Sequence, residues 1–257
     1  MKEELEEIAK AVRMAVLPVA GTPSAGEIVG HGADGNFSYR IDRIAEDAAF
    51  SKIKEMGLKY NILSEESQFQ DNGAEETLVL DPVDGSRNAI NGLPMFSVSI
   101  AVGKKNLAGV RAGLVMDILS GRVYYAEKDN GATMDDKPLK TRKYDERRSV
   151  FLLNLGANAS SNLYDLSRKS PVVRSYGSAA LEICLVAEGR ADLYANRSID
   201  NRHAVRIVDI AAASLILREA GGELYDATGN LLEMQFDIND RKNIFAVGDS
   251  TLRRLVV

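Results

Sequence analysis

Five acidic residues of this 257-residue chain stand where carboxylates could meet around a cation. Two follow an apolar pair, two flank a proline, and one enters an apolar helix; they are Glu65, Glu66, Asp81, Asp84 and Asp209. Hard cations such as Mg²⁺ prefer carboxylate, carbonyl, water and phosphate oxygens. No His or Cys adjoins these acids, and the calcium-binding EF-hand spacing is missing. The cluster therefore favours Mg²⁺ over zinc or calcium.

Each acid also has an ordinary structural explanation. Asp-Pro and Asp-Gly are common turn sequences, and an Asp in the first turn of a helix stabilises the helix dipole. The combination is harder to explain in that way. Residues 85–88 (GSRN) follow the two aspartates and could point backbone N–H groups at a phosphate where a helix starts. The pattern predicts phosphate binding beside a metal.

The elements that must position these acids come mainly from the first half of the chain. Apolar spacing predicts helices at the N-terminus and over 41–56, and strands over 77–80 and 96–102. Residues 81–85 should form a turn at the end of the first strand. Residues 20–40 contain many Gly and Pro and predict an irregular, mobile surface loop. Strands are also predicted over 110–116, 122–126 and 131–134, and the turns between them predict an antiparallel meander.

In the second half of the chain, predicted strands alternate with predicted helices. Strands are expected over 150–155, 192–195, 223–225 and 243–247, and helices over 178–189 and 207–220. The whole is an α+β chain with a layered α/β arrangement. We expect residues 1–257 to form one folded unit with a soft division near residue 145, into halves 1–145 and 146–257.

Composition limits the partners and the compartment. With 37 acidic and 32 basic residues, the net charge of −5 offers no broad cationic surface for nucleic acid. Cys184 is the only cysteine, so no intramolecular disulfide can form and a reducing compartment is favoured. The acidic N-terminus does not resemble a secretion signal, and no apolar run approaches the ~20 residues that span a bilayer. These features predict a cytoplasmic protein without a membrane partner.

Several segments together resemble the inositol monophosphatase superfamily. They are LSEES at 63–67, DPVDGS at 81–86, VDIAA at 208–212, NFSYRID at 36–42, YYAEKDNGATMDDKPL at 124–139, GSAALE at 177–182 and EAGG at 219–222. The order and spacing match over nearly the whole chain. GADG at 32–35 and the arginines before Asp209 resemble the archaeal-type branch with dual fructose-1,6-bisphosphatase and inositol-1-phosphatase activity. The resemblance implies the α/β/α/β/α sandwich of sugar phosphatases.

The resemblance also implies roles for individual residues. Two or three Mg²⁺ would be held by Glu65, Asp81, the backbone carbonyl of Val83, Asp84 and Asp209. Glu66 would be a supporting or structural residue. Ser86 matches a hydroxyl that, with the residue corresponding to Asp42, helps to activate the attacking water. Asp42, Glu65 and Ser86 are thus the predicted catalytic residues.

The resemblance also implies which residues contact the substrate. Gly177, Ser178 and Ala179 match a substrate-contacting turn, although the same sequence is an ordinary helix N-cap. Gly85, Ser86 and Arg87 are the candidates at the phosphate. Arg202 falls where inositol-selective members have a Glu that contacts hydroxyls. An arginine there disfavours strict selectivity for inositol monophosphate and favours a substrate with a second phosphate. The alternative is that Arg202 faces solvent or pairs with Asp200.

Three classes of function remain to be compared. The first is a Mg²⁺-dependent phosphomonoesterase acting on a small sugar or polyol phosphate, with a 3′-phosphoadenosine 5′-phosphate or other nucleotide phosphatase as the alternative within the superfamily. The second is a two-metal nuclease, which the net charge disfavours. The third is a non-catalytic regulatory protein on the same fold, which the complete ligand set disfavours. We expect a homodimer or homotetramer.

Overall fold

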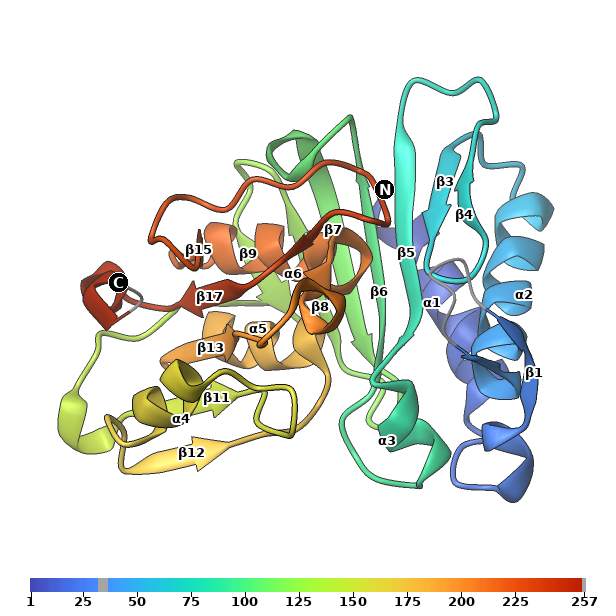
Figure 1. The fold of residues 1–257 in the computed structure, drawn as a ribbon. Helices are drawn as coiled ribbons and strands as arrows, with labels where there is room; N and C mark the ends of the chain where they lie inside the picture. The colour runs from blue at the N-terminus through green and yellow to red at the C-terminus, as the bar shows by residue number, and fades with distance from the viewer. Residues whose placement is uncertain (32–36, 256–257) are drawn as a thin grey trace.

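The computed structural model describes residues 1–31 and 37–255, and its core consists of two sheets with helices between and outside them (Figure 1). The larger sheet has eight strands. In spatial order they are β10 (Lys137–Pro138), β9 (Ala132–Met134), β8 (Val123–Glu127), β7 (Val110–Asp117), β6 (Ser97–Gly103), β5 (Thr77–Asp84), β3 (Asn61–Ser64) and β4 (Gln68–Gln70). All neighbouring pairs are antiparallel except β3 and β5. The predicted antiparallel meander is confirmed.

The smaller sheet has five strands from the second half of the chain. In spatial order they are β12 (Val172–Arg174), β11 (Val150–Leu153), β13 (Leu193–Asn196), β17 (Ile244–Val247) and β15 (Glu223–Asp226). The pairs of β11 with β12 and β13 are parallel, and those of β17 are antiparallel. Two short two-stranded pairs complete the strands: β1 (Ile28–His31) with β2 (Phe37–Tyr39), and β14 (Val205–Arg206) with β16 (Arg241–Lys242).

The helices form three layers around these sheets. α1 (Lys2–Val16) and α2 (Arg40–Glu55) pack on the outer face of the large sheet, and α5 (Ala179–Ala187) and α6 (Ile207–Glu219) lie between the sheets (Figure 1). α4 (Ser161–Ser167) and η5 (Ser250–Leu255) share the core on the other face of the small sheet. The predicted layered α/β/α/β/α sandwich is therefore confirmed. Short helices make up the rest: α3 (Ser86–Ile90), η1 (Pro23–Gly26), η2 (Leu107–Gly109), η3 (Glu146–Arg148) and η4 (Asn201–His203).

The burial of α6 explains its unusual composition. A helix that contacts apolar surface on all sides has no polar stripe, and Ile207 to Leu217 are buried apart from Asp209. Small side chains let the helix approach the large sheet closely. A Cβ added at Gly113 on β7 would lie 2.8 Å from the carbonyl oxygen of Ala212, which is too close for any side chain. Asp209 is held at the start of this rigid helix.

Two local predictions were wrong. Residues 20–40 were predicted to lack regular structure, but their described part contains η1 and the antiparallel pair β1–β2. Residues 32–36, with the GADG motif, lie outside the described residues. The predicted turn over 81–85 is also wrong, because β5 continues to Asp84 with a shift in register between Asp81 and Asp84. The predicted division near residue 145 stays a prediction.

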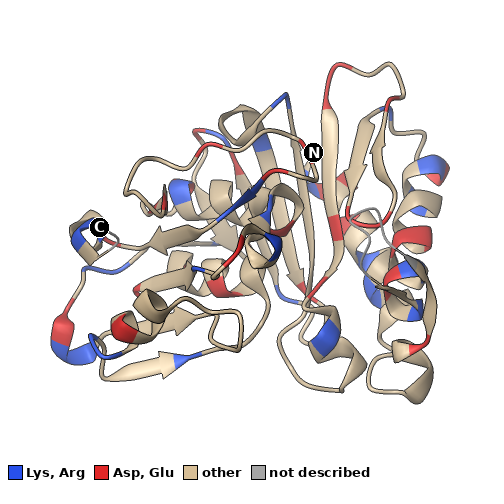
Figure 2. Ribbon diagram, viewed as in Figure 1, with Lys and Arg blue, Asp and Glu red and all other residues tan. Residues whose placement is uncertain are grey.

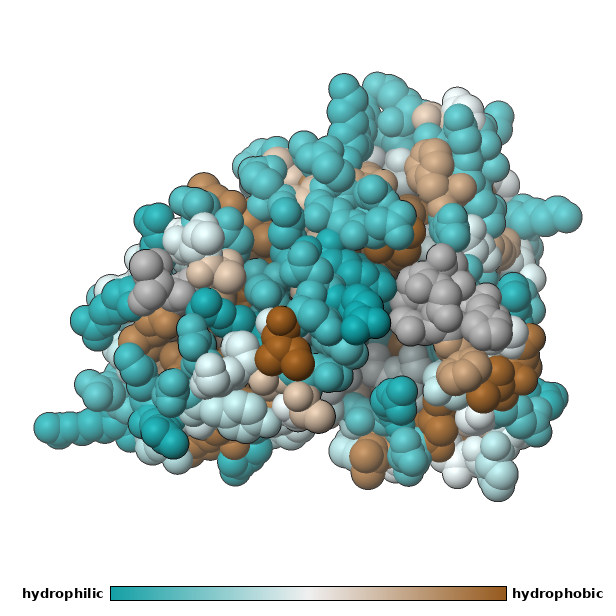
Figure 3. Space-filling model, viewed as in Figure 1, coloured by the Kyte–Doolittle hydropathy of each residue, from teal (hydrophilic) through white to brown (hydrophobic). Residues whose placement is uncertain are grey.

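The face of the molecule in view carries mixed charge and scattered apolar groups. Figure 2 shows acidic and basic segments along both sheets and their helices, and Figure 3 shows a largely hydrophilic face with scattered apolar residues. Of the helices in the described part of the chain, none has the length and apolar character needed to cross a membrane.

Candidate active site

Two of the predicted acids lie at the carboxyl end of β5. Asp81 is 2% exposed and Asp84 is 7% exposed. The register shift between them lets Val83 donate its N–H to Asp81 Oδ1 at 3.1 Å, while its carbonyl accepts the Ser86 hydroxyl at 3.1 Å. Bulges redirect side chains at the ends of strands, and here the bulge gathers two carboxylates and a carbonyl within four residues.

Gly85 connects β5 to α3 and lies against the turn over residues 176–178. Its φ of 90° lies in the left-handed region, which favours glycine. A Cβ at this position would also lie 2.9 Å from the Met95 carbonyl oxygen and 3.2 Å from that of Gly177. Both constraints require glycine, and the close approach places the start of α3 against the predicted substrate-contacting turn.

The N-terminus of α5 holds Asp84. The hydroxyl of Ser178 donates to Asp84 Oδ2 at 2.5 Å, and the N–H groups of Ala179 and Ala180 donate to its two oxygens at 3.2 and 2.8 Å. Burial raises the pKa of Asp84 to about 7, against the lowering effect of these hydrogen bonds. The amide groups compensate for only part of the lost hydration of the carboxylate.

Glu182 fixes the same turn from the other side, and sequence reasoning gave it no role. Its side chain is 1% exposed and accepts the N–H groups of Tyr176 at 3.2 Å and Gly177 at 3.0 Å. Burial raises its pKa to about 7. Asn88 completes the anchor, because its Nδ2 donates to the Tyr176 carbonyl oxygen at 2.6 Å.

Arg206 brings Glu65 and Asp209 together. Its Nη2 lies 2.5 Å from Glu65 Oε1 and 2.9 Å from Asp209 Oδ1. Asp209 is the third residue of α6, and its Oδ2 accepts the backbone N–H of Arg206 at 2.8 Å. Glu65 directly follows β3 and lies 141 residues before Arg206 in the chain. The ion pairs therefore join the large sheet to the helix between the sheets.

Asp42 and Ser86 lie together at the outer side of the carboxylates. Asp42 is the third residue of α2, with an exposed fraction of 7%. Burial and the charge of Glu65 raise the pKa of Asp42 to about 7, whereas a hydrogen bond with the Ser86 side chain lowers it. The structure thus brings together the two residues that were predicted to orient water.

The remaining predicted residues share two adjoining pockets. The inner pocket is lined by Glu65, Asp81, Val83, Asp84, Gly85, Ser86, Gly177, Ala179 and Asp209 among others. The outer pocket adds Asp42, Arg87, Arg202 and Arg241. Ser178 lines neither pocket and reaches the site only through Asp84. Arg202 lies at the rim with 87% of its side chain exposed, and its Nη2 is 3.5 Å from Asp200 Oδ2.

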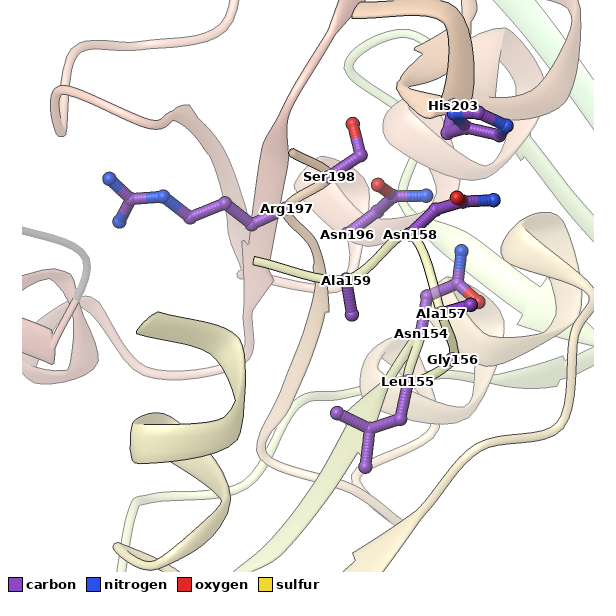
Figure 4. Close-up of a pocket in the computed structure, with 10 residues that line it drawn as sticks. All are labelled: Asn154, Leu155, Gly156, Ala157, Asn158, Ala159, Asn196, Arg197, Ser198 and His203. Carbon is purple, nitrogen blue, oxygen red and sulfur yellow. The ribbon is translucent and has the colours of Figure 1, made fainter. Parts of the chain in front are cut away.

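A third pocket opens beside the inner one, and the sequence did not predict it. It is shared with the inner pocket through Asn154, Asn196 and His203, and Asn158 adds another amide (Figure 4). In Figure 4 these amides lie near one another, whereas the Arg197 side chain extends away from them. Asn154 and Asn196 end or follow the parallel strands β11 and β13. Ligands commonly bind at the carboxyl ends of parallel strands, which is the signal that could have identified them.

The donor set fits a hard divalent cation. Burial, and then the charges of Glu65, Asp84 and Asp209, raise the pKa of Asp81 well above its usual range, so negative charge is in excess here. Among residues 1–31 and 37–255, however, no three acidic, His or Cys side chains already converge as ligands of one ion. Glu65 and Asp209 are turned to Arg206, and Asp84 to α5. A cation would take oxygens that now have protein partners.

These carboxylates, Ser86 and several arginines line adjoining polar pockets of the five-layer sandwich. The model of the inositol monophosphatase family matches residues 2–255. The chain belongs to this family. Membership implies a divalent metal cofactor.

Individual relatives support the assignment over the whole chain. A fructose-1,6-bisphosphatase/inositol-1-monophosphatase of Methanocaldococcus jannaschii is 34% identical over 252 residues, which are 97% of this chain and 95% of the relative. A crystal structure of an inositol monophosphatase–fructose 1,6-bisphosphatase superposes with a TM-score of 0.89 at 31% identity, covering 99% of this chain and 97% of the other. A bifunctional NADP phosphatase/NAD kinase of Methanococcus maripaludis is 31% identical over all of this chain and 48% of its own length.

Proposed function

We propose that the protein hydrolyses phosphate monoesters of small sugar or polyol phosphates, with fructose 1,6-bisphosphate and inositol 1-phosphate as the main candidates. Glu65, Asp81, the Val83 carbonyl, Asp84 and Asp209 would hold two or three Mg²⁺. When bound, these ions neutralise phosphate charge and make water more acidic. The observation that carries the proposal is the joint lining of one cleft by these oxygens and the Ser86 hydroxyl.

Water activation is assigned to Ser86 and Asp42. The two side chains interact, and both line the outer pocket next to the carboxylates. A hydroxyl relayed to a carboxylate can orient a water molecule and accept its proton. Glu65 faces the same space and would assist by binding a cation.

A second phosphate on the substrate would suit the outer pocket. Arg87, Arg202, Arg206 and Arg241 contribute to its lining. Guanidinium groups stay charged and can bind phosphate oxygens bidentately. The ion pair of Arg202 with Asp200 is exposed and screened by solvent, so it offers little resistance to such a contact. The amides of the third pocket would suit sugar hydroxyls.

A nucleotide phosphatase is the second candidate within the same chemistry. It is favoured by the NADP phosphatase name of the Methanococcus maripaludis relative. The same metal core could accept a different leaving group, since the phosphate and not the rest of the molecule meets the carboxylates. A polymeric nucleic-acid substrate is disfavoured by the net charge of −5.

The test is phosphate release with Mg²⁺ from fructose 1,6-bisphosphate, inositol 1-phosphate, 3′-phosphoadenosine 5′-phosphate and NADP, measured side by side. We expect the highest kcat/KM for fructose 1,6-bisphosphate and no release with EDTA. Greater kcat/KM for either nucleotide would replace the sugar-phosphate proposal with the nucleotide one. Release of phosphate from none of the four would refute both.

We propose further that the protein acts in the cytoplasm as a homodimer or homotetramer. The single cysteine, Cys184, is buried and free, which suits a reducing compartment. Closed symmetric assemblies are the commonest oligomers of soluble proteins. Light scattering after size-exclusion chromatography would measure the assembly; a monomer at micromolar concentration would contradict this part of the proposal.

A further inference from the structure

The guanidinium of Arg206 lies inside the group of carboxylates that would hold the metal. Its side chain is 11% exposed. Besides the contacts of Nη2 with Glu65 and Asp209, its Nε lies 3.2 Å from Asp209 Oδ1. With the backbone N–H of Arg206 on Oδ2, both oxygens of Asp209 are bonded to this one residue. Arg206 therefore uses oxygens that two of the proposed ligands would offer to a cation.

A guanidinium and a divalent ion are not compatible partners for the same oxygens. The guanidinium is permanently charged and repels a second cation at short range, most strongly where solvent is excluded. At the same time, the charge of Arg206 offsets the negative charges of the partly buried Glu65 and Asp209 and of the buried Asp81, and removing a partner from such a group is costly. Arg206 thus has opposite effects on the metal-free and metal-bound states.

We infer that Arg206 is a resident counter-cation that pairs with Glu65 and Asp209 when the metal is absent and weakens divalent-ion binding at that edge of the site. The inference rests on the metal ligands named in the proposed function. It is carried by the contacts of the Arg206 guanidinium with Glu65 and Asp209. Ion binding would require the guanidinium to move away from these oxygens, which keeps the metal exchangeable.

The test uses the full-length protein stripped of metal with EDTA, and no substrate. Mg²⁺ binding is measured by calorimetry, and the melting temperature is measured with and without Mg²⁺. Arg206→Met keeps the length of the side chain but removes its charge. We expect it to bind Mg²⁺ at least tenfold more tightly than the wild type, to melt at a lower temperature without metal, and to gain more from added Mg²⁺. Arg206→Lys keeps the charge and should stay within about threefold of the wild-type Kd.

Arg142→Met is the matched control. Arg142 also pairs through two nitrogens with a buried carboxylate, with Nε 2.9 Å and Nη2 2.5 Å from the oxygens of Asp192. It lines none of the three pockets described above. We expect the loss of this ion pair to lower the melting temperature and to leave the Mg²⁺ affinity unchanged. An equal rise in affinity in this variant would overturn the inference.

Two further results would also overturn it. One is unchanged or weaker Mg²⁺ binding by Arg206→Met, because Arg206 would then position the ligands and not compete for them. The other is failure of the wild type to bind Mg²⁺. If Arg206→Met folds only with metal, its rate of Mg²⁺ release to a chelator replaces the calorimetric measurement, and slower release than in the wild type supports the inference. Absence of phosphatase activity with these binding results intact would refute only the proposed function.

Discussion

Glu182 allows a quantitative test of the site through pH. Its pKa is raised from 4.5 to about 7 by burial, so the folded protein keeps a proton that the unfolded chain releases. The resulting stability is fully present below pH 4.5 and is lost as pH rises toward 7. Each pKa unit corresponds to about 1.36 kcal/mol, so the limiting loss is about 3 kcal/mol, of which about 2.5 kcal/mol falls between pH 5 and pH 8.

Glu182→Gln should remove this pH dependence. The amide cannot ionise, and its single carbonyl oxygen can replace only one of the two contacts to Tyr176 and Gly177, which costs about 1 kcal/mol at every pH. For a chain of this size, 1 kcal/mol shifts the melting temperature by about 2–4 °C. The wild type should therefore lose about 5–10 °C relative to the variant between pH 5 and pH 8.

The assay is thermal unfolding by circular dichroism at pH 5, 6, 7 and 8 with EDTA, for both proteins. Glu55→Gln, at an exposed position at the end of α2, controls for the loss of one carboxylate. Parallel pH curves for the wild type and Glu182→Gln would refute the reasoning. They would mean that the folded protein binds no more protons at residue 182 than the unfolded chain does.

Three further predictions concern activity. Asp84→Asn should lower kcat by several orders of magnitude with an unchanged circular dichroism spectrum, because it removes an anionic ligand; near-normal turnover would contradict the metal assignment. Ser86→Ala and Asp42→Asn should each lower kcat more than Mg²⁺ affinity, and the double variant should lose little more than either single one, whereas multiplicative losses would separate the two residues. Arg202→Ala should raise KM for fructose 1,6-bisphosphate several-fold and leave inositol 1-phosphate unaffected; equal effects on both would remove Arg202 from substrate selection.

The sequence predicted those parts of the site that depend on local patterns. The carboxylates at 81, 84 and 209 sit at a strand end and a helix start that apolar spacing reveals. The end of β5 was misplaced because Asp-Pro favours turns, whereas in the folded protein β5 pairs with β6 on both sides of a bulge. Tertiary pairing overrode the local preference there, as it did for β1, which lies in the Gly- and Pro-containing segment 20–40.

The contacts that sequence reasoning missed join distant residues. Arg206 reaches Glu65 across 141 positions, and Asn88 reaches Tyr176 across 88. No local pattern encodes such pairs. Glu182 is five residues from Gly177, yet its role is hidden too, because a Glu in the first turn of a helix is ordinarily explained by the helix dipole.

The position of Asp84 makes the site depend on the docking of the two sheets. Its backbone belongs to β5 of the large sheet, and its carboxylate is held by Ser178 and the first N–H groups of α5, which lies against the small sheet. Gly85 adds a close backbone contact with Gly177. A separation of these elements by even 1 Å would lengthen every one of these hydrogen bonds and leave Asp84 buried with fewer donors. Mutations far from the cleft that loosen α5, such as a larger side chain at Gly113 acting through α6, should therefore reduce activity before they unfold the protein.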